Sequence, residues 1–235
     1  MGDTVTTLIG LALAFGGLYA RRFVHACLPS GVLPSAPDSW SRRFVSDLWK
    51  WVVGALLVVF VLVVERRSLG SVGVQPLPPV QFGGWIVGGF AGTVVLASVV
   101  RAVYERYDLE YPREFGTEHA ARPTAAYLFT ALTAGVTESL LFQAYPIERL
   151  TALTGSLTVA VVLAWLAFAV AHYPGDVFSL EETVYIGVPA LALTVLYALS
   201  GSIFVVIVVH TAANAISFLS AAREIADESG ATAGG

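Results

Sequence analysis

The chain has 235 residues, of which 56% are hydrophobic and only 13% are charged. Because soluble domains carry about a quarter charged residues, this composition indicates a protein that lies in lipid. The formal net charge of -4 offers no basic field, so we predict no nucleic-acid partner. The single cysteine, Cys27, excludes an internal disulfide framework and has no cysteine partners for a structural zinc site.

Seven apolar runs follow one another along the chain, separated by charged or Pro- and Gly-rich breaks. A membrane-spanning helix needs about 20 apolar residues. We therefore predict an all-α, polytopic transmembrane bundle with about seven spans, at 4–20, 49–65, 82–103, 123–149, 156–173, 183–200 and 202–221. These spans form a single transmembrane domain over residues 1–222, and the polar tail at 223–235 is predicted to be disordered.

The distribution of Lys and Arg predicts the orientation of this bundle, since cytoplasmic loops usually carry the excess of positive charge. With the N-terminus outside, ten of the 13 Lys and Arg residues fall on the inner side. The three that remain on the outer side are Arg66, Arg67 and Arg149. We therefore expect a multi-pass protein of the cell membrane with its N-terminus outside and its C-terminus in the cytoplasm.

Five strongly polar residues interrupt the apolar runs in the second half of the chain, namely Glu138, Gln143, His172, His210 and Asn214. A charged side chain inside a bilayer costs roughly 3 kcal/mol on insertion scales, so such residues indicate a functional site. His210 and Asn214 are four positions apart, and a helix places them on one face. The clustering of these residues in the later spans predicts one shared site.

The spacing of Glu138 and His172 predicts that they lie at the same depth. They are 34 residues apart, and Gly155 marks a turn midway between them. A helical hairpin about Gly155 places each residue roughly 25 Å along its helix, toward the cytoplasmic face. His210 fits this depth less well, because it lies only about nine residues from the outer end of its span.

These side chains suit the hydrolysis of a peptide bond. Glu138 and His172 could activate one water molecule as a general base. His210 and Asn214 could then donate hydrogen bonds to the oxyanion of the tetrahedral intermediate. Alternatively, Glu138, His172 and His210 could hold a zinc ion with one open position for water, and the residues leave both chemistries open.

At these positions the sequence resembles the CPBP family of intramembrane proteases (CAAX protease and bacteriocin-processing, also called Abi). The family carries Glu-Glu-x-x-x-Arg, then Phe-x-x-x-His, then His-x-x-x-Asn. The second motif is intact as Phe168-Ala-Val-Ala-His172 and the third as His210-Thr-Ala-Ala-Asn214. The resemblance covers about residues 123–221, so it implies a CPBP-like core in the last four spans.

The first motif departs from the family pattern. It reads Glu138-Ser-Leu-Leu-Phe-Gln143, with Ser139 in place of the second Glu and Gln143 in place of the Arg. The chain therefore lacks one carboxylate and one arginine that would form an ion pair. Neutral hydrogen bonds from Ser139, Gln143 or Thr137 would have to hold Glu138 instead. This change implies either an enzyme of altered specificity or an inactive relative.

The resemblance implies an intramembrane endopeptidase. Glu138 and His172 then activate water, His210 and Asn214 stabilise the oxyanion, and Phe168 packs above the site. The family has been described both as metalloproteases and as metal-independent glutamate proteases, so we expect no cofactor while zinc remains possible. The expected partners are membrane lipid and a peptide or lipid-modified protein that enters from the cytoplasmic side.

Two other functions remain as alternatives. One is a catalytically inactive CPBP relative that acts as a membrane binding or immunity protein, which the changes at Ser139 and Gln143 favour. The other is a proton-coupled transporter with Glu138 as the proton carrier. The transporter is less favoured, because the sequence shows no matched, Gly- or Pro-broken helices in two halves.

Overall fold

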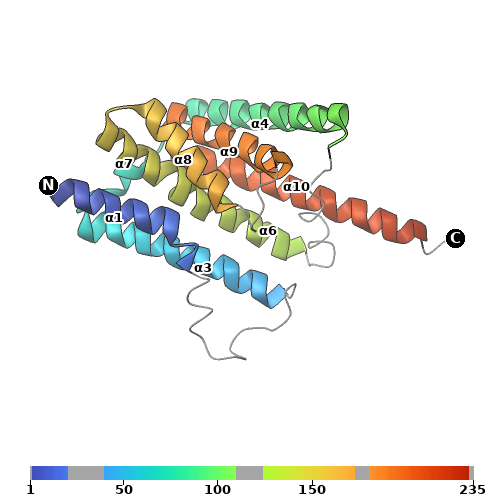
Figure 1. Cartoon of the computed structure of the whole chain (residues 1–235), viewed down its shortest axis with the longest axis horizontal. Helices are drawn as coiled ribbons and strands as arrows, with labels where there is room; N and C mark the ends of the chain where they lie inside the picture. Colours follow the sequence, from blue (N-terminus) through green and yellow to red (C-terminus); the bar gives the residue numbers. More distant parts are fainter. Residues whose placement is uncertain (1, 21–39, 110–123, 173–179, 233–235) are drawn as a thin grey trace.

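The computed structural model describes residues 2–20, 40–109, 124–172 and 180–232, and the regular secondary structure of these residues is all helical, with no strand among them (Figure 1). The elements in chain order are α1 (Gly2–Gly16), α3 (Trp40–Val59), the π-helix η1 (Phe60–Val64), the 3-10 helix η2 (Leu69–Val72), α4 (Pro79–Tyr107), α6 (Thr124–Thr133), the π-helix η3 (Ala134–Ala144), α7 (Tyr145–Thr154), α8 (Leu157–Ala171), α9 (Leu180–Ser200) and α10 (Ile203–Thr232). The predicted all-α fold is confirmed.

The predicted spans fall on these helices. Four helical stretches are long and apolar enough to cross a membrane by length and composition, and they are Phe44–Val64, Pro79–Tyr107, Thr124–Thr154 and Ile203–Ser220. The apolar stretches Asp3–Gly16, Leu157–Ala171 and Val184–Ser200 are shorter. The structure is thus the predicted helical membrane bundle, while the number of crossings stays a prediction.

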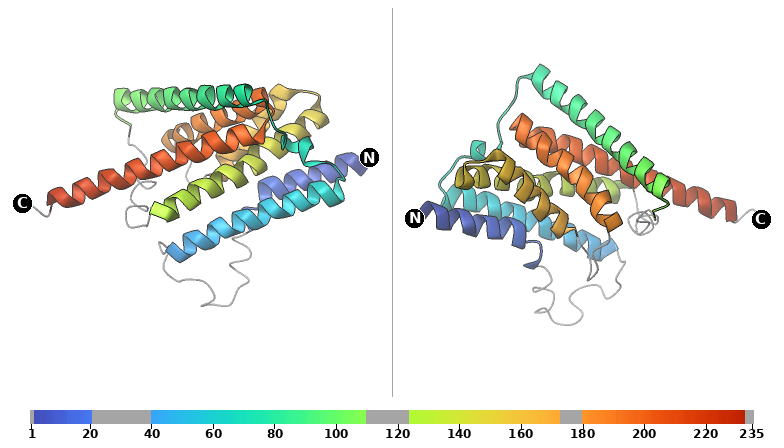
Figure 2. Two further views of the ribbon diagram at one scale, coloured as in Figure 1. Left: turned by 180° about the vertical axis from the view of Figure 1, so that it is seen from behind. Right: turned by 45° about the horizontal axis from the view of Figure 1, so that its top comes forward.

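The C-terminal tail follows the last span. Helix α10 continues to Thr232 in the structure, and the disorder of the tail at 223–235 stays a prediction. Ala, Arg and Glu are frequent from residue 221 to 228, and these residues favour a helix that the preceding span has already nucleated. The last turns of α10 extend beyond the other helices (Figures 1 and 2). Residues 233–235 lie outside the described part of the chain.

One continuous helix, made of α6, η3 and α7, occupies the centre of the bundle. Figure 2 shows it between α3 on one side and α10 on the other. Leu141, Phe142 and Ala144 on this helix are fully buried. A helix that is apolar all round is stable only when other elements cover it, which is why this segment lies inside. Helix α4 instead lies at the edge, against α9 and α10 (Figure 1).

The hairpin between α7 and α8 turns where the sequence predicted. Gly155 ends α7 with φ of 70°, a left-handed conformation that favours glycine, and its N–H donates to the carbonyl of Thr151. Ser156 then begins α8, and its side chain accepts a hydrogen bond from the N–H of Val159. The predicted turn at Gly155 is therefore confirmed.

A buried ion pair anchors this end of the bundle. Arg149 of α7 donates to Glu65 at 2.6 Å from Nη2 and 2.9 Å from Nε, and to the Ser71 carbonyl at 3.0 Å from Nη1. The Tyr145 hydroxyl donates to the other oxygen of Glu65 at 2.7 Å. The side chains of Arg149 and Glu65 are only 2% and 3% exposed. This network ties the end of α3–η1 and the loop after it to the central helix.

Candidate active site

The central helix carries Glu138 on an eleven-residue π-helix, η3. Backbone hydrogen bonds in a π-helix run from residue i to i+5, and such segments are frequent at functional sites. Within it, the Thr137 hydroxyl donates to the carbonyl of Thr133 at 2.7 Å, a contact that often bends helices. The apolar run at 123–149 predicted a helix here but gave no sign of this distortion.

Three side chains from other parts of the chain meet at the Glu138 carboxylate. Lys50 of α3 donates to Oε1 at 2.6 Å. On the other oxygen, Oε2, the Nε2 atom of His172 lies at 3.5 Å and that of His210 at 4.0 Å. We refer to Lys50, Glu138, His172 and His210 as the polar cluster. The residue after the end of α8 and helix α10 supply its two histidines, so only the tertiary packing brings the cluster together.

His172 follows the last residue of α8, where the helix ends. Its Nδ1 lies 2.9 Å from the Phe168 carbonyl, which can only accept a hydrogen bond. Nδ1 therefore carries a proton, and the Nε2 atom faces Glu138. With 24% of its side chain exposed, His172 is the most accessible member of the polar cluster.

Phe168 lies against both histidines. Its ring stacks on that of His172 with centroids 4.2 Å apart, and it meets His210 edge-on at 6.4 Å. On its other side it contacts Phe142 at 5.2 Å. The Phe168 ring thus packs against both imidazoles and restricts their side-chain rotamers.

His210 is almost completely buried, and Ser139 is its neighbour on the side away from Glu138. The Ser139 hydroxyl lies 3.4 Å from the Nδ1 atom of His210. If the hydroxyl donates, Nδ1 is the acceptor and the proton of the neutral imidazole lies on Nε2. That proton would point toward the space beside Glu138.

The depth of His210 is explained by where α10 begins. The N–H of Ile203 donates to the Gly73 carbonyl at 3.0 Å, and Tyr197 at the end of α9 donates to Glu148 at 3.0 Å. The turn between α9 and α10 is therefore level with Glu148, well inside the turn at Gly155. Because α10 begins deeper in the bundle than the turn at Gly155, only a few residues of α10 are needed to bring His210 level with Glu138.

The structure does not connect every predicted site residue to the polar cluster. Asn214 lies one turn beyond His210 on α10 and is half-buried, with no hydrogen bond to the polar cluster in the described part of the chain. Gln143 is fully buried, and neither its Oε1 nor its Nε2 finds a protein partner among the described residues. Neither residue holds Glu138 directly.

Lys50 is the member of the polar cluster that the sequence did not predict. It is the only lysine in the chain and was counted among the inner-side charges that orient the bundle. Its position one residue inside the apolar run at 49–65 was the available signal, because a charge within a span needs a partner.

The zinc alternative requires Glu138, His172 and His210 to act as ligands together. Within the described ranges, no group of three His, Cys, Asp or Glu side chains is arranged to hold a metal ion. A cation bound at Glu138 would also face the ammonium of Lys50 on the other oxygen, and like charges repel. The donor set of this site therefore fits zinc poorly.

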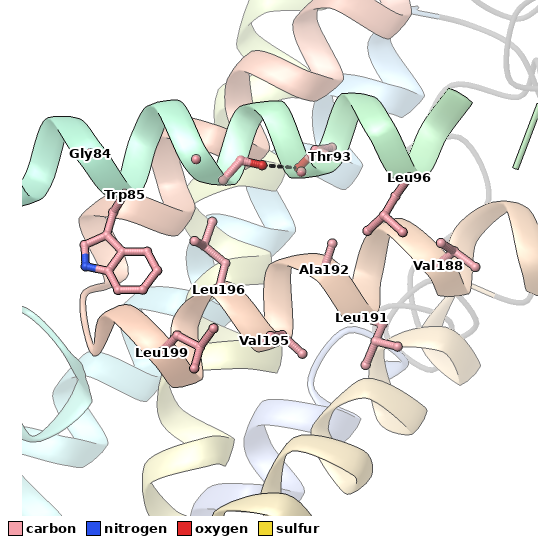
Figure 3. A pocket seen from close by; sticks show the side chains of 13 residues that line it. Gly84, Trp85, Thr93, Leu96, Val188, Leu191, Ala192, Val195, Leu196 and Leu199 are labelled. Carbon is pink, nitrogen blue, oxygen red and sulfur yellow. Dashed lines mark hydrogen bonds between the residues drawn. The ribbon is translucent and has the colours of Figure 1, made fainter. Parts of the chain in front are cut away.

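A separate apolar groove lies between α4 and α9 (Figure 3). It has a volume of about 600 Å³ and is lined on one side by glycines of α4, including Gly84 and Gly88, and on the other by Leu and Val side chains of α9. It shares no lining residue with the polar cluster.

The comparison with protein families agrees with this geometry. Residues 120–216 match the family described as type II CAAX prenyl endopeptidase Rce1-like. The search of curated proteins found no match, and neither did the search of solved structures. The family match and the four apolar helices point to residence in a membrane. The resemblance to the CPBP proteases is thereby confirmed, and at the level of the family the match over residues 120–216 suggests a CAAX-type intramembrane protease.

Proposed function

We propose that this protein is an intramembrane endopeptidase that hydrolyses a peptide bond at the polar cluster. The observation that carries the proposal is the convergence of His172 and His210, from two helices, on one carboxylate oxygen of Glu138. All three residues lie within the segment that matches the Rce1-like family.

Glu138 and His172 are suited to activate water together. Because Nδ1 of His172 donates to the Phe168 carbonyl, its Nε2 is an acceptor in the neutral ring, as is Oε2 of Glu138. A water molecule can donate to both atoms and keep a lone pair for attack. As its oxygen bonds to the carbonyl carbon, the proton passes to this pair. The same proton then goes to the leaving amine as the C–N bond breaks.

His210 is suited to stabilise the oxyanion. A hydroxyl proton donated from Ser139 to Nδ1 leaves the Nε2–H of His210 as a donor toward the site. Asn214, one turn further along α10, would supply a second donor once substrate is bound. Preorganised donors of this kind often contribute about 3 to 4 kcal/mol to transition-state stabilisation.

The substrate in this proposal is a peptide or a lipid-modified protein tail that enters from the cytoplasmic side. His172, the most accessible residue of the polar cluster, lies at the end of α8 away from the Gly155 turn. With the N-terminus outside, the positive-inside distribution makes that end of the multi-pass bundle cytoplasmic. Membrane lipid surrounds the apolar outer faces of the helices.

The proposal is tested in purified protein reconstituted in lipid, with a panel of CAAX-type reporter peptides. Glu138→Gln and His172→Ala should each lower turnover by roughly 10²- to 10⁴-fold, the contribution of a general base. Arg101→Met is the matched control, because Arg101 forms an exposed ion pair with Glu105 on α4. Turnover at the wild-type rate in Glu138→Gln or in His172→Ala would contradict the assignment of these residues as the general base.

Metal dependence is tested separately. We expect turnover to survive prolonged chelation and metal analysis to find less than one zinc per chain. Loss of turnover that zinc restores would instead favour Glu138, His172 and His210 as ligands.

A second candidate function is a lapsed protease that binds a membrane partner. Ser139 and Gln143 favour it, since both replace charged residues of the family motif and the Gln143 side chain has no hydrogen-bond partner among the described residues. Proteolysis that appears only in the double variant Ser139→Glu with Gln143→Arg would support this candidate. Turnover by the wild-type protein would contradict it.

A further inference from the structure

We propose that Lys50 is a positioning residue for Glu138, and that it supplies from α3 the positive charge that the degenerate first motif lacks at Gln143. This inference rests on the proposed function, because it assigns to Lys50 the task of orienting the general base. It adds a residue that lies outside the segment matched to the Rce1-like family.

The ion pair between Lys50 and Glu138 is short and largely enclosed. The Nζ to Oε1 distance is 2.6 Å, and the two side chains are 20% and 5% exposed. Since Lys50 occupies Oε1, only Oε2 remains to face the two histidines. The contact therefore fixes which oxygen of the carboxylate can accept a proton from water.

Helix α3 holds Lys50 in register with the central helix on both sides. Asp47 lies one turn before Lys50 on α3. Its carboxylate accepts a hydrogen bond from the Thr130 hydroxyl at 2.7 Å. The Trp51 indole, next to Lys50, donates to the Thr133 hydroxyl at 3.0 Å. Positions three and four apart on a helix share a face, so this stripe of α3 faces the central helix as a unit. Lys50 is thus placed by its neighbours and not by its ion pair alone.

The charges of the polar cluster explain why a cation is needed. A buried carboxylate without a partner is so unfavourable that it takes up a proton instead. The histidines do not provide a fixed charge, because a neutral imidazole suffices for their hydrogen bonds. Gln143 is buried and uncharged. Lys50, whose Nζ lies 2.6 Å from Glu138, therefore supplies a positive charge that favours the carboxylate form of Glu138, the form that can act as a base.

The test compares three changes in reconstituted protein. Lys50→Met keeps the length and apolar stem of the side chain but removes the charge. Lys50→Arg keeps the charge. Lys50→Met with Gln143→Arg moves the charge to the position where the family motif carries it. Arg101→Met on the surface of α4 is the control for loss of a positive charge.

Two readouts are followed. The first is turnover of the reporter peptides, resolved into kcat and KM. The second is the infrared C=O stretch of a protonated carboxyl group, assigned to Glu138 by its loss when Glu138→Gln is combined with Lys50→Met. This spectroscopic signal does not depend on catalysis, and a purely structural role of Lys50 would not change it.

We expect Lys50→Met to lower kcat roughly 100-fold with little change in KM, the effect of a misplaced reacting group. The protonated-carboxyl band should appear in the same variant. Lys50→Arg should retain most of the wild-type kcat and show no such band. If the Gln143→Arg double variant folds, it should recover at least part of the lost kcat.

Unchanged kcat in Lys50→Met, or an increased one, would overturn the inference, since an increase would make Lys50 an inhibitory contact. Absence of the carboxyl band in a folded Lys50→Met protein would overturn it as well. Failure of the proposed function looks different. In that case Glu138→Gln cleaves as well as the wild type, or no variant cleaves, while the infrared band still reports on Lys50.

Discussion

Two carboxylate–cation pairs meet the same central helix, and they differ in what surrounds them. At Glu65 and Arg149, both oxygens and all three guanidinium nitrogens have protein partners, and neither side chain is more than 3% exposed. At Glu138 and Lys50, one carboxylate oxygen accepts from Lys50 at 2.6 Å, while the other lies 3.5 Å from Nε2 of His172 and 4.0 Å from Nε2 of His210. The first pair is closed and the second is open.

The difference shows how a buried charge in this bundle can serve either stability or chemistry. A closed pair recovers the cost of its burial only through complete and well-oriented hydrogen bonding. An open pair leaves a lone pair of electrons unused, which is unfavourable for stability but necessary for a base. We therefore assign Glu65–Arg149 to anchoring the loop at its end of the bundle and Glu138–Lys50 to the site.

The largest expected effect comes from breaking the closed pair. Arg149→Met should lower the free energy of unfolding by about 3 to 5 kcal/mol, because it leaves Glu65 buried without a cation. Unfolding of the purified protein in detergent, followed by circular dichroism, measures this loss. Arg101→Met, at an exposed pair, should change the same quantity by no more than about 0.5 kcal/mol. Equal losses in the two variants would contradict the description of Glu65–Arg149 as closed.

A smaller effect is expected from the packing behind the open pair. A methyl group on Gly135 would overlap the Thr211 side chain and lie 3.1 Å from the Ile207 carbonyl of α10. Gly135→Ala should therefore destabilise the protein by about 1 to 3 kcal/mol and lower turnover, because it pushes α10 and His210 away from Glu138.

Gly83→Ala is the matched control for this packing change. Apart from its chain neighbours and the nearby backbone of α4, no atom of the described residues lies within 4 Å of the methyl group it would add. It should leave turnover unchanged and raise stability by up to about 1 kcal/mol through helix propensity. Unfolding measured for both variants sharpens the comparison. Wild-type stability and turnover in Gly135→Ala would show that α10 is not packed tightly against Gly135.

The smallest expected effect is on stability when the open pair is replaced as a whole. Lys50→Met combined with Glu138→Gln removes both charges, and such replacements are often neutral or stabilising. The free energy of unfolding should stay within about 1 kcal/mol of the wild type while turnover is lost. A loss of unfolding free energy as large as that of Arg149→Met would mean that Glu138–Lys50 stabilises the fold as Glu65–Arg149 does.

Much of the fold could be predicted from the chain because lipid imposes simple rules. Backbone groups inside a membrane must bond within their own segment, so long apolar runs become helices. The helix starts and turns followed local signals such as Gly155 and Ser156. The sequence leaves the state of the tail at 223–232 open, since its charged and small residues are compatible with both a helix and disorder.

The polar residues of the site could be selected from the sequence, but their arrangement could not. Glu138, His172 and His210 were singled out because each is costly at membrane depth. Their distances depend on how deep α10 begins, which Gly73, Tyr197 and Glu148 determine by long-range contacts. The π-helix at 134–144 also escaped prediction, because its register depends on packing against neighbouring helices.

The sequence by itself determined the membrane bundle, the order of its helices and the residue types of the site, because hydropathy and motif spacing are local properties. Only the tertiary structure decided that Lys50 pairs with Glu138 and that Arg149 pairs with Glu65 in a buried position. It also decided that, among the described residues, Asn214 and Gln143 form no hydrogen bond to the polar cluster. The two ion pairs join residues 80 or more positions apart, and no local rule can pair them. They arise only when the helices pack and each buried charge must find its partner.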